Sequence, residues 1–310
     1  MNRFIKSPFN YVGGKFRLLP QIFPCFPDNI SIFVDLFCGG GNVGINAPAK
    51  YVKYNDKNIH IGGILRFFRK NGFQKTIEGI SSIIRQYDLS SSIMDEKNAR
   101  IKKKSGKLSD YNRISFEKLR KDYNDMKNNN DPSSFSDLML YVLIIYSFNF
   151  QIRFNLKGMY NSPVGKHDFN PSIKHNLECF INRICSQNCS ISDHDFRNYD
   201  ILRLGEEDFV YLDPPYLITL ASYNEKGGWK ERDEYDLLDF IDNLNSRKIR
   251  FALSNVLSCK GKENNILKVW LAGNNYVVKH LEHSYANSNY HKNDKKSPSD
   301  EILVMNYIKE

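Results

Sequence analysis

The sequence contains no apolar run long enough to cross a membrane. Its longest such run extends from Leu138 to Ile145, far short of the roughly 20 residues that a spanning helix needs. The N-terminal residues MNRFIKSPFN have no apolar stretch of the kind found in signal peptides. We therefore expect a cytoplasmic protein, with a buried helix over residues 138–150.

Cysteine is scarce, and its spacing is irregular. The six cysteines include no Cys-x-x-Cys pair, although structural zinc sites favour closely spaced pairs. A zinc site formed by Cys179, Cys185 and Cys189 with His175 or His194 is therefore the weaker interpretation. Reduced thiols are the stronger one, and we expect no metal.

Phosphate-binding loops are missing as well. The chain has no GxxxxGK[ST] loop and no clear GxGxxG spacing. Its 310 residues are 41% hydrophobic and 25% charged, which is ordinary for a globular protein and excludes a disordered one. The excess of 44 basic over 35 acidic residues gives a net charge of +9. This balance favours an acidic polymer as partner, and nucleic acid is the usual one.

Two stretches of strands and turns flank a central region of different character. Residues 1–60 and those from 189 onward carry short apolar runs between turns, whereas the region between them is polar, with helical patches. We therefore expect an α/β fold in which residues 1–60 and 189–310 form one domain. Residues 61–188 then form an inserted, mostly helical domain.

Individual elements can also be placed. Residues 31–37 and 51–56 predict strands joined by a glycine-rich turn and a helix, which is the opening of a doubly wound sheet. Further segments predict strands at 208–216, 249–256 and 301–307, an amphipathic helix at 233–247, and a β-hairpin or extended loop at 153–166.

The first motif is the glycine-rich turn DLFCGGGN, residues 35–42. Glycines allow a backbone to approach a ligand closely at the carboxyl edge of a parallel sheet. Asp56 ends the next strand, where an acidic residue commonly holds a ribose. The pair indicates a cofactor that carries a nucleoside but no pyrophosphate. A structural turn beside a surface aspartate is the alternative.

The second motif is Asp213-Pro214-Pro215-Tyr216, directly after the apolar run FVYL. Two prolines end a strand and release carbonyl groups from sheet pairing. The carboxylate and a proline carbonyl then offer two acceptors to an amine on an aromatic ring, and Tyr216 can stack on that ring. A proline-terminated strand with a capping aspartate is the alternative.

Together these motifs resemble a known family. PFNYVGGKFRLLPQI (8–22), FVDLFCGGGNVGIN (33–46) and YLDPPY (211–216) look like motifs X, I and IV of Dam-type, or D12 class, adenine-N6 DNA methyltransferases. Their order is similar to that of the alpha group of amino-methyltransferases. The resemblance covers most of the chain except residues 65–135. It implies a Rossmann-like methyltransferase fold with an inserted, mostly helical DNA-recognition domain that carries a β-hairpin.

The resemblance also implies a reaction without a metal. Such enzymes transfer a methyl group from S-adenosylmethionine, leaving S-adenosylhomocysteine, to N6 of an adenine flipped out of duplex DNA. Asp213 would accept one amine hydrogen, the Pro214 carbonyl the other, and Tyr216 would stack on the base. The implied cofactor site comprises Tyr11, Lys15, Phe37, Gly39, Gly41, Asp56, Asp195, Phe196 and Asp213, and the implied catalytic set comprises Lys15, Asp213, Pro214, Pro215 and Tyr216.

The resemblance further assigns residues to DNA recognition. Phe148 aligns with an aromatic wedge, Asn149 and Arg153 with base-contacting positions, and Pro163 with one that meets a thymine methyl. Phe150-Gln151 replace the smaller residues typical of GATC readers, so the expected target is a short site containing GA or GAT, with GATC as one candidate. The implied DNA-binding set is Phe148, Asn149, Gln151, Arg153, Pro163, Lys166, Lys292 and Lys295.

The implied context is a bacterial or phage-encoded, nucleoid-associated protein acting on double-stranded DNA as a monomer or weak dimer. It would serve an epigenetic or restriction–modification role, with a cognate restriction endonuclease as a further partner. Two alternatives remain open. One is methylation of another amine, either cytosine N4 or a base in RNA, because the DPPY motif suits any planar amine. The other is a catalytically silent DNA-binding relative.

Overall fold

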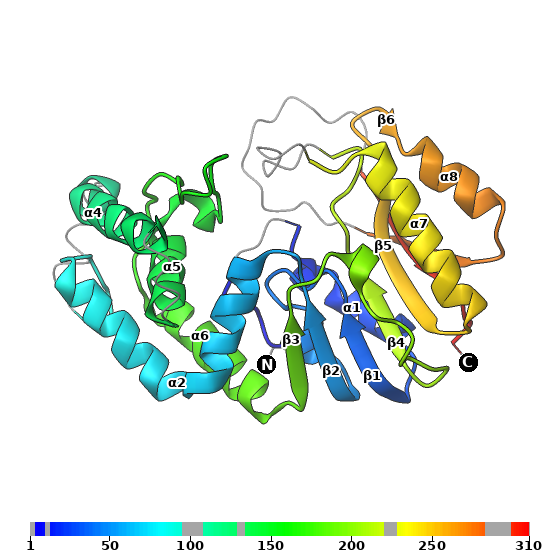
Figure 1. The fold of residues 1–310 in the computed structure, drawn as a ribbon, viewed down its shortest axis with the longest axis horizontal. Helices are drawn as coiled ribbons and strands as arrows, with labels where there is room; N and C mark the ends of the chain where they lie inside the picture. Colours follow the sequence, from blue (N-terminus) through cyan, green and yellow to red (C-terminus); the bar gives the residue numbers. More distant parts are fainter. Residues whose placement is uncertain are drawn as a thin grey trace. The chain divides into compact units, whose positions relative to one another are not determined.

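The chain divides into two compact units. The computed structural model describes residues 4–9, 13–94, 108–128, 134–219, 228–282 and 299–309. One unit, here called the sheet unit, comprises Lys15–Lys57 and Ser192–Glu310; the other, the helical unit, comprises Met1–Gly14 and Asn58–Ile191. Both are drawn in Figure 1. The sequence had placed residues 1–14 with the strands, whereas here they group with the helices.

The sheet unit contains most of a mainly parallel sheet, whose edge strand at residues 189–192 falls mostly within the helical unit as divided above. The strand order is β3-β2-β1-β4-β5-β8-β7, with β6 paired to β5. β1 pairs in parallel with β2 and β4, β4 pairs in parallel with β5, and β8 is antiparallel to both β5 and β7. The strands are β1 (Ile30–Asp35), β2 (Ala49–Asn55), β3 (Cys189–Ser192), β4 (Phe209–Leu212), β5 (Arg250–Cys259), β6 (Lys262–Glu263), β7 (Val277–Leu281) and β8 (Asp300–Met305).

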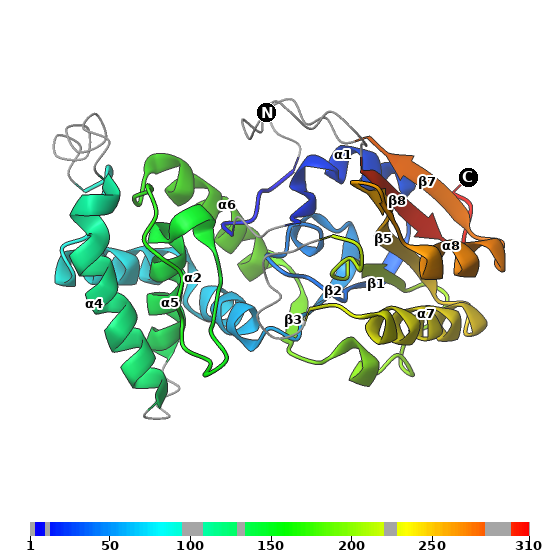
Figure 2. The same cartoon turned by 90° about the horizontal axis from the view of Figure 1, so that it is seen from above.

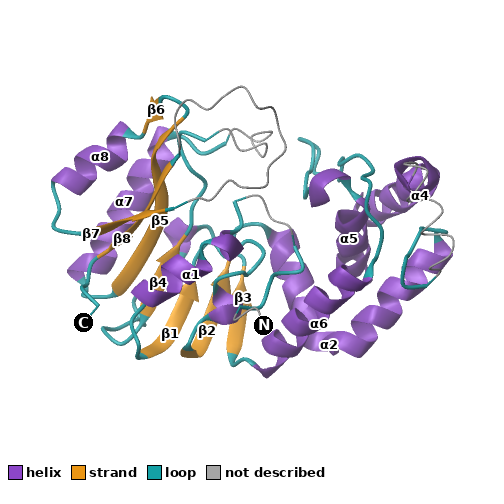
Figure 3. Cartoon of the chain, turned by 180° about the vertical axis from the view of Figure 1, so that it is seen from behind, coloured by secondary structure: helices purple, strands orange, loops and turns teal. Residues whose placement is uncertain are grey.

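Both faces of this sheet are covered, as Figures 2 and 3 show. Helices α7 (Glu231–Ser246) and α8 (Asn265–Ala272) cover one face, and the short α1 (Leu19–Ile22) lies over the other. Alternate residues of a strand point to opposite faces. Val210 and Leu212 therefore share a buried cluster with the apolar side of α7, while Phe209 packs against Phe26 on the opposite face at 4.9 Å between ring centroids.

Most predicted elements of this unit are confirmed, but one is wrong. Strands β1, β2, β4, β5 and β8 and helix α7 lie where the sequence predicted them. Between β1 and β2, however, the regular structure is limited to a three-residue 3₁₀ turn, η3 (Gly44–Asn46), in place of a helix. The backbone N–H groups of Gly39 and Gly44 are committed to Asp56 and Asp35. This segment is therefore held as a loop.

The helical unit contains four helices within its described residues. They are α2 (Ile59–Gln86), α4 (Leu108–Asn128), α5 (Ser134–Tyr146) and α6 (Pro171–Ser186). Helix α5 contacts both α2 and α4, and α2 also contacts α6. The predicted buried helix is confirmed from Leu138 to Tyr146, where every residue is buried, but it ends at Tyr146 rather than at residue 150. Phe9 packs on Phe68 and Tyr141, which attaches the N-terminal residues to this unit.

Three further findings concern predictions made from the sequence. No helix in the described part of the chain is long and apolar enough to span a membrane. Residues 147–166, here called the recognition loop, form an extended loop rather than a regular hairpin. Its antiparallel pairing within the described residues consists of two isolated bridges, Ser147 with Val164 and Phe154 with Tyr160. All six cysteines are free thiols.

Candidate active site

The candidate site lies at the carboxyl ends of two adjacent parallel strands. Asp35 is the last residue of β1, and Asp213 directly follows β4. The register pairs Asp35 with Tyr211, so both aspartates reach the same edge of the sheet. In doubly wound sheets, ligands bind at this edge where the strand order reverses. Here the reversal lies at β1, with β2 on one side and β4 on the other.

Lys15, Asp213, Tyr216 and Glu301 form one hydrogen-bonded group, here called the catalytic cluster. Lys15 Nζ lies 2.8 Å from Asp213 Oδ1 and 3.3 Å from Glu301 Oε1, and it donates a hydrogen bond to the Tyr216 hydroxyl. That hydroxyl in turn lies 2.9 Å from Asp213 Oδ1 and 3.3 Å from Glu301 Oε1. The fold thus brings together the predicted residues Lys15, Asp213 and Tyr216, although Lys15 and Tyr216 are 201 positions apart in the sequence.

The charges in this cluster do not cancel. Lys15 and Glu301 are only 4% and 6% exposed at their side chains, and Asp213 is 19% exposed. Burial lowers the pKa of Lys15, but the charges of Asp213 and Glu301 outweigh it and raise that pKa overall. Burial raises the pKa of Asp213, which Lys15 only partly offsets. One ammonium beside two carboxylates leaves an excess of negative charge, which suits a cationic ligand.

Within the described residues, polar partners reach one oxygen of Asp213. Lys15 and Tyr216 both lie within hydrogen-bond distance of Oδ1, and no described residue forms a hydrogen bond or ion pair with Oδ2. Because a carboxylate offers about four acceptor positions, Asp213 retains acceptor capacity on an atom whose orientation its neighbours fix. Such a pre-oriented acceptor can bind the N–H of a ligand.

Glu301 is the member of this cluster that the sequence had not singled out. It lies in β8, beside β5 in the sheet, and is buried with the following apolar residues. The sequence did contain one signal: Glu301 directly precedes the apolar run ILVM, residues 302–305. Buried carboxylates are rare unless they are paired, but the sequence does not name the partner.

The glycine-rich turn closes onto Asp56. The Gly39 N–H donates to Asp56 Oδ2 at 2.8 Å, and Gly39 and Gly41 both have positive φ, 46° and 75°. Glycine adopts that region without a steric penalty, so the loop can fold back to the end of β2. The predicted residues Gly39 and Asp56 are therefore in direct contact.

Asp35 lies beneath this loop and is almost fully buried. Its Oδ2 accepts a hydrogen bond from the Gly44 N–H at 2.8 Å. Burial is the main cause that raises the pKa of Asp35 to about 7, and the charges of Asp213 and Asp56 add to it. The loop is therefore anchored by a carboxyl group whose protonation changes near neutral pH.

Three aromatic rings gather beside the loop. Phe37 and Phe196 lie 5.4 Å apart between ring centroids, and Trp229 lies 6.1 Å from Phe37 and 5.8 Å from Phe196. They come from the exits of β1 and β3 and from the residues before α7. The two predicted residues Phe37 and Phe196 therefore belong to one apolar wall. Trp229 completes that wall, although the sequence had not singled it out.

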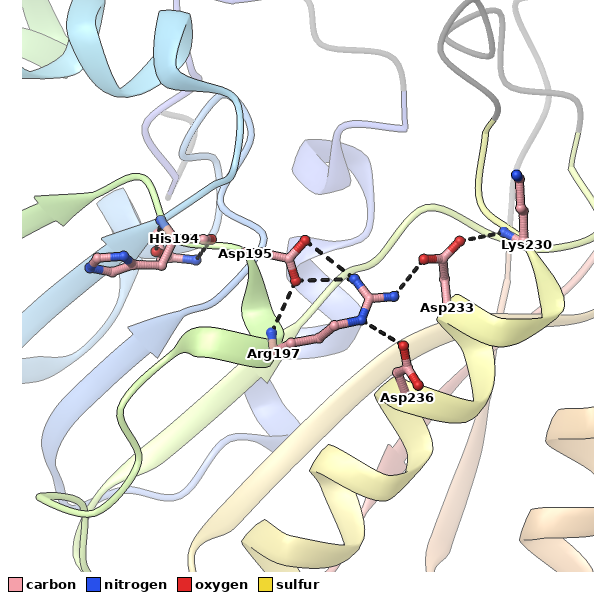
Figure 4. A network of polar contacts seen from close by, with 7 residues as sticks. His194, Asp195, Arg197, Lys230, Asp233 and Asp236 are labelled. Atoms are coloured by element: carbon pink, nitrogen blue, oxygen red, sulfur yellow. Dashed lines mark hydrogen bonds and ion pairs between the residues drawn. The ribbon is translucent and has the colours of Figure 1, made fainter.

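Asp195, beside Phe196, is held by a network of charges that Figure 4 shows. Its carboxylate accepts from Arg197 at 3.1 Å, and the same guanidinium reaches Asp233 at 2.5 Å and Asp236 at 2.6 Å on α7. The Arg197 Cζ also lies 4.6 Å from the centroid of the Phe196 ring. This network fixes the exit of β3 against the start of α7.

The recognition loop has a firmly bonded backbone. The Phe148 N–H donates to the Pro163 carbonyl at 2.8 Å, and the Gln151 carbonyl accepts from the Tyr160 and Ser162 hydroxyls. A side chain at Gly165 would begin 2.3 Å from the Ser147 carbonyl oxygen, so only glycine allows this close approach. The loop therefore presents its side chains from a fixed frame.

Several side chains on this frame are available for contacts. Within the described residues, the side-chain amides of Asn149 and Gln151 have no hydrogen-bond partner, and Phe148 is 46% exposed. Arg153 is held in place by Asn161, which accepts from its Nε at 3.0 Å and its Nη2 at 2.9 Å. Pro163 and Lys166 are exposed, whereas the predicted Tyr11, Lys292 and Lys295 lie outside the described residues.

Comparison with known proteins gives a consistent result. The model of the D12 class N6 adenine-specific DNA methyltransferases matches residues 11–287. The chain is 40% identical over 311 residues to the modification methylase StsI of Streptococcus sanguinis. It is also 40% identical over 312 residues to the type II methyltransferase M.FokI of Planomicrobium okeanokoites.

The lengths of these relatives differ from that of the chain. The matches cover 98% and 99% of this chain but only 43% of StsI and of M.FokI. The type II methyltransferase M.MjaIII of Methanocaldococcus jannaschii is 28% identical, with 81% of this chain and 84% of its own length covered. The chain thus spans less than half the length of StsI and of M.FokI, but most of the length of M.MjaIII.

Proposed function

Because the chain belongs to the D12 class N6 adenine-specific DNA methyltransferase family, we propose that it methylates N6 of adenine in duplex DNA. The proposed donor is S-adenosylmethionine, and the proposed target is a short site containing GA or GAT. The observation that carries the proposal is the catalytic cluster. It presents Asp213 Oδ2 as an oriented acceptor at the carboxyl edge of the sheet.

The residues present fit S-adenosylmethionine. Its adenine would lie against Phe37 and Phe196, with Asp195 as acceptor, and Asp56 would hold the ribose hydroxyls beside Gly39. The excess negative charge of the catalytic cluster complements a sulfonium ion. No metal is needed for this chemistry. When bound, the cofactor supplies a methyl group activated by its sulfonium, and the remaining product is the neutral thioether S-adenosylhomocysteine.

The chain's own residues would prepare the amine. Asp213 Oδ2 would accept one N6 hydrogen and the Pro214 carbonyl the other, which localises the nitrogen lone pair for attack on the methyl carbon. Tyr216, whose hydroxyl is held by Lys15 and Asp213, would stack on the flipped base. On accepting the methyl group from the bound cofactor, N6 would gain a positive charge, while the donor would leave as the neutral thioether. The extra proton on N6 would pass to Asp213 and then to water.

The recognition loop would read the DNA. Phe148 would enter the space left by the flipped base, because it is the exposed aromatic side chain of the loop. Asn149 and Gln151 would contact base edges, Arg153 a guanine, and Pro163 a thymine methyl. Lys166, with Lys292 and Lys295, would contact phosphates, which supply affinity but no sequence choice.

The proposed context is a restriction–modification system with a cognate endonuclease. It is supported by the relatives, which are named as modification methylases and type II methyltransferases. The proposed reaction and the recognition of one short site rest instead on the family to which the chain belongs and on its own residues.

The test is to map modified bases. The protein would be expressed in a host without adenine methylation, and genomic DNA would be read by single-molecule sequencing, with nucleoside mass spectrometry to identify the product. We expect N6-methyladenine in one short motif, and none with the Asp213→Ala variant. Methylated cytosine N4, a modified RNA base, or cofactor binding without any product would each contradict the proposal and point to one of the alternatives.

A further inference from the structure

Glu301 brings a second carboxylate into the catalytic cluster. It is 5% exposed, and its Oε1 lies 3.3 Å from both Lys15 Nζ and the Tyr216 hydroxyl. Asp213 Oδ1 contacts the same two groups at shorter range, 2.8 and 2.9 Å. The two carboxylates therefore compete for one ammonium and one hydroxyl proton.

Two neighbouring ionisable groups also interact with Asp213. They are Asp35 at the end of β1 and Tyr211 in β4, and the Tyr211 hydroxyl lies 2.7 Å from that of Ser254. Lys15 pairs with both Asp213 and Glu301, and both charges raise its pKa.

We infer that Glu301 is a positioning residue that draws part of the Lys15 charge away from Asp213 and so keeps Asp213 a strong acceptor for the adenine amine. The inference deepens the proposed function and rests on it. Glu301 shares the partners Lys15 and Tyr216 with Asp213, and its like charge also acts on Asp213.

Removing the charge of Glu301 has a predictable direction. With Glu301 neutral, Asp213 no longer shares the Lys15 charge with a second carboxylate of the cluster, which stabilises the ionised form of Asp213. The like charge of Glu301 contributes to raising the pKa of Asp213, so its loss lowers that pKa. A less basic carboxylate holds the amine hydrogen less strongly and takes the extra proton less readily.

The experiment compares Glu301→Gln with the wild-type protein. We expect kcat for DNA methylation to fall about tenfold, with KM for S-adenosylmethionine and for DNA changed less than twofold. The acid limb of the kcat profile moves to lower pH, because methylation requires ionised Asp213 and its pKa has fallen. A residue that only supports the fold would lower the amount of active protein without moving this limb.

A second readout does not depend on turnover. The carboxyl carbon of Asp213, assigned by its disappearance in Asp213→Asn, is titrated by ¹³C NMR in the cofactor-free protein. We expect its midpoint to move to lower pH in Glu301→Gln. Asp208→Asn is the matched control, because Asp208 is also buried but bonds Ile32 and Gly205 at the opposite end of β4. It leaves the midpoint and the limb unchanged.

The outcomes separate the two proposals. If the wild-type protein makes no N6-methyladenine, the proposed function fails, whatever the titration shows. If it does, but the Asp213 midpoint and the acid limb of Glu301→Gln match those of the wild type, the inference fails alone. Should Glu301→Gln not fold, Glu301→Asp retains the charge at greater distance. It must lower kcat without raising either KM, and a raised KM with unchanged kcat overturns the inference.

Discussion

The catalytic cluster and the recognition loop are organised in opposite ways. In the cluster the side chains bond to one another, are largely buried, and carry two carboxylates against one lysine. In the recognition loop the backbone is bonded, whereas the amides of Asn149 and Gln151 have no partner within the described residues. The loop sequence contains no acidic residue and three basic ones, Arg153, Lys157 and Lys166.

This difference indicates how the two tasks can change independently. Side chains that bond to one another cannot be replaced singly without disturbing the others, because a buried charge left unpaired is costly. Side chains that project from a bonded backbone can be replaced without loss of that backbone. We therefore expect substitutions in the cluster to alter the rate of one reaction, and substitutions in the loop to alter where the reaction occurs.

The largest effect is expected for Asp213→Asn. The amide has nearly the same shape but lacks the charge, so it accepts the N6 hydrogen and the released proton poorly. We expect kcat to fall by about a thousandfold, within the range of general acid–base effects, while DNA affinity and site preference change less than twofold. Single-turnover methylation and gel-shift titration on the same DNA measure both quantities.

A matched variant tests the separation between the two regions. Asp208→Asn removes a buried carboxylate at the other end of β4, and its rate should stay within threefold of the wild type. A similar loss of rate in both variants would show that any buried carboxylate of the sheet matters equally. A changed site preference in Asp213→Asn would contradict the division of tasks.

A smaller effect concerns stability and pH. Burial raises the pKa of Asp35 to about 7 from an ordinary value of 3.8. Between these values the folded protein binds more protons than the unfolded chain, so the free energy of unfolding falls as the pH rises. Three pKa units correspond to at most about 4 kcal/mol. We expect Asp35→Asn to remove this decline, because its amide is uncharged at every pH.

The measurement is urea unfolding of both proteins between pH 4 and pH 8. The variant should gain stability relative to the wild type as the pH rises, and most of the gain should appear below pH 7. Its side-chain oxygen can still accept from Gly44, so the glycine-rich turn should remain in place. If the free energies of unfolding of the two proteins instead changed in parallel with pH, ionisation of Asp35 would not destabilise the folded protein, and the prediction would be wrong.

Short motifs allowed Asp213 and Tyr216, half of the cluster, to be predicted from the sequence. Two prolines after an apolar run end strand β4 at Leu212 and so place Asp213 at the edge of the sheet. The glycine-rich turn likewise ends strand β1 at Asp35. These signals are local, because the residue types that end a strand are also its neighbours in the chain. Lys15 and Tyr11 came only from the resemblance.

The contribution of Glu301 could not be predicted in this way. It reaches Lys15 because β8 inserts beside β5, antiparallel to it, and no local pattern specifies that neighbour. The helix expected after β1 failed for a related reason. Its backbone donors are taken by Asp35 and Asp56, contacts that form only once the sheet has assembled. Contacts between residues distant in the sequence thus determine both the position of Glu301 and the loop after β1.

The smallest effect is expected for Gln151→Ala in the recognition loop. An amide that reads a base edge through two hydrogen bonds contributes about 1–3 kcal/mol of discrimination. Sites altered at one base pair should therefore gain about fivefold to 150-fold relative to the original site, while kcat at saturating DNA stays within threefold. Competition between paired oligonucleotides, followed by sequencing of methylated sites, gives the ratio directly.

Lys157→Ala is the matched control, because Lys157 is exposed in the same loop and offers charge without a base-reading amide. Its loss should weaken binding to all sequences alike and make binding less dependent on salt. Gln151→Ala should do neither. If Gln151→Ala weakened binding to every site equally and left the ratio between sites unchanged, Gln151 would contact the DNA backbone rather than a base. The reading of that base pair would then belong to another residue of the loop, with Asn149 the next to test by the same competition.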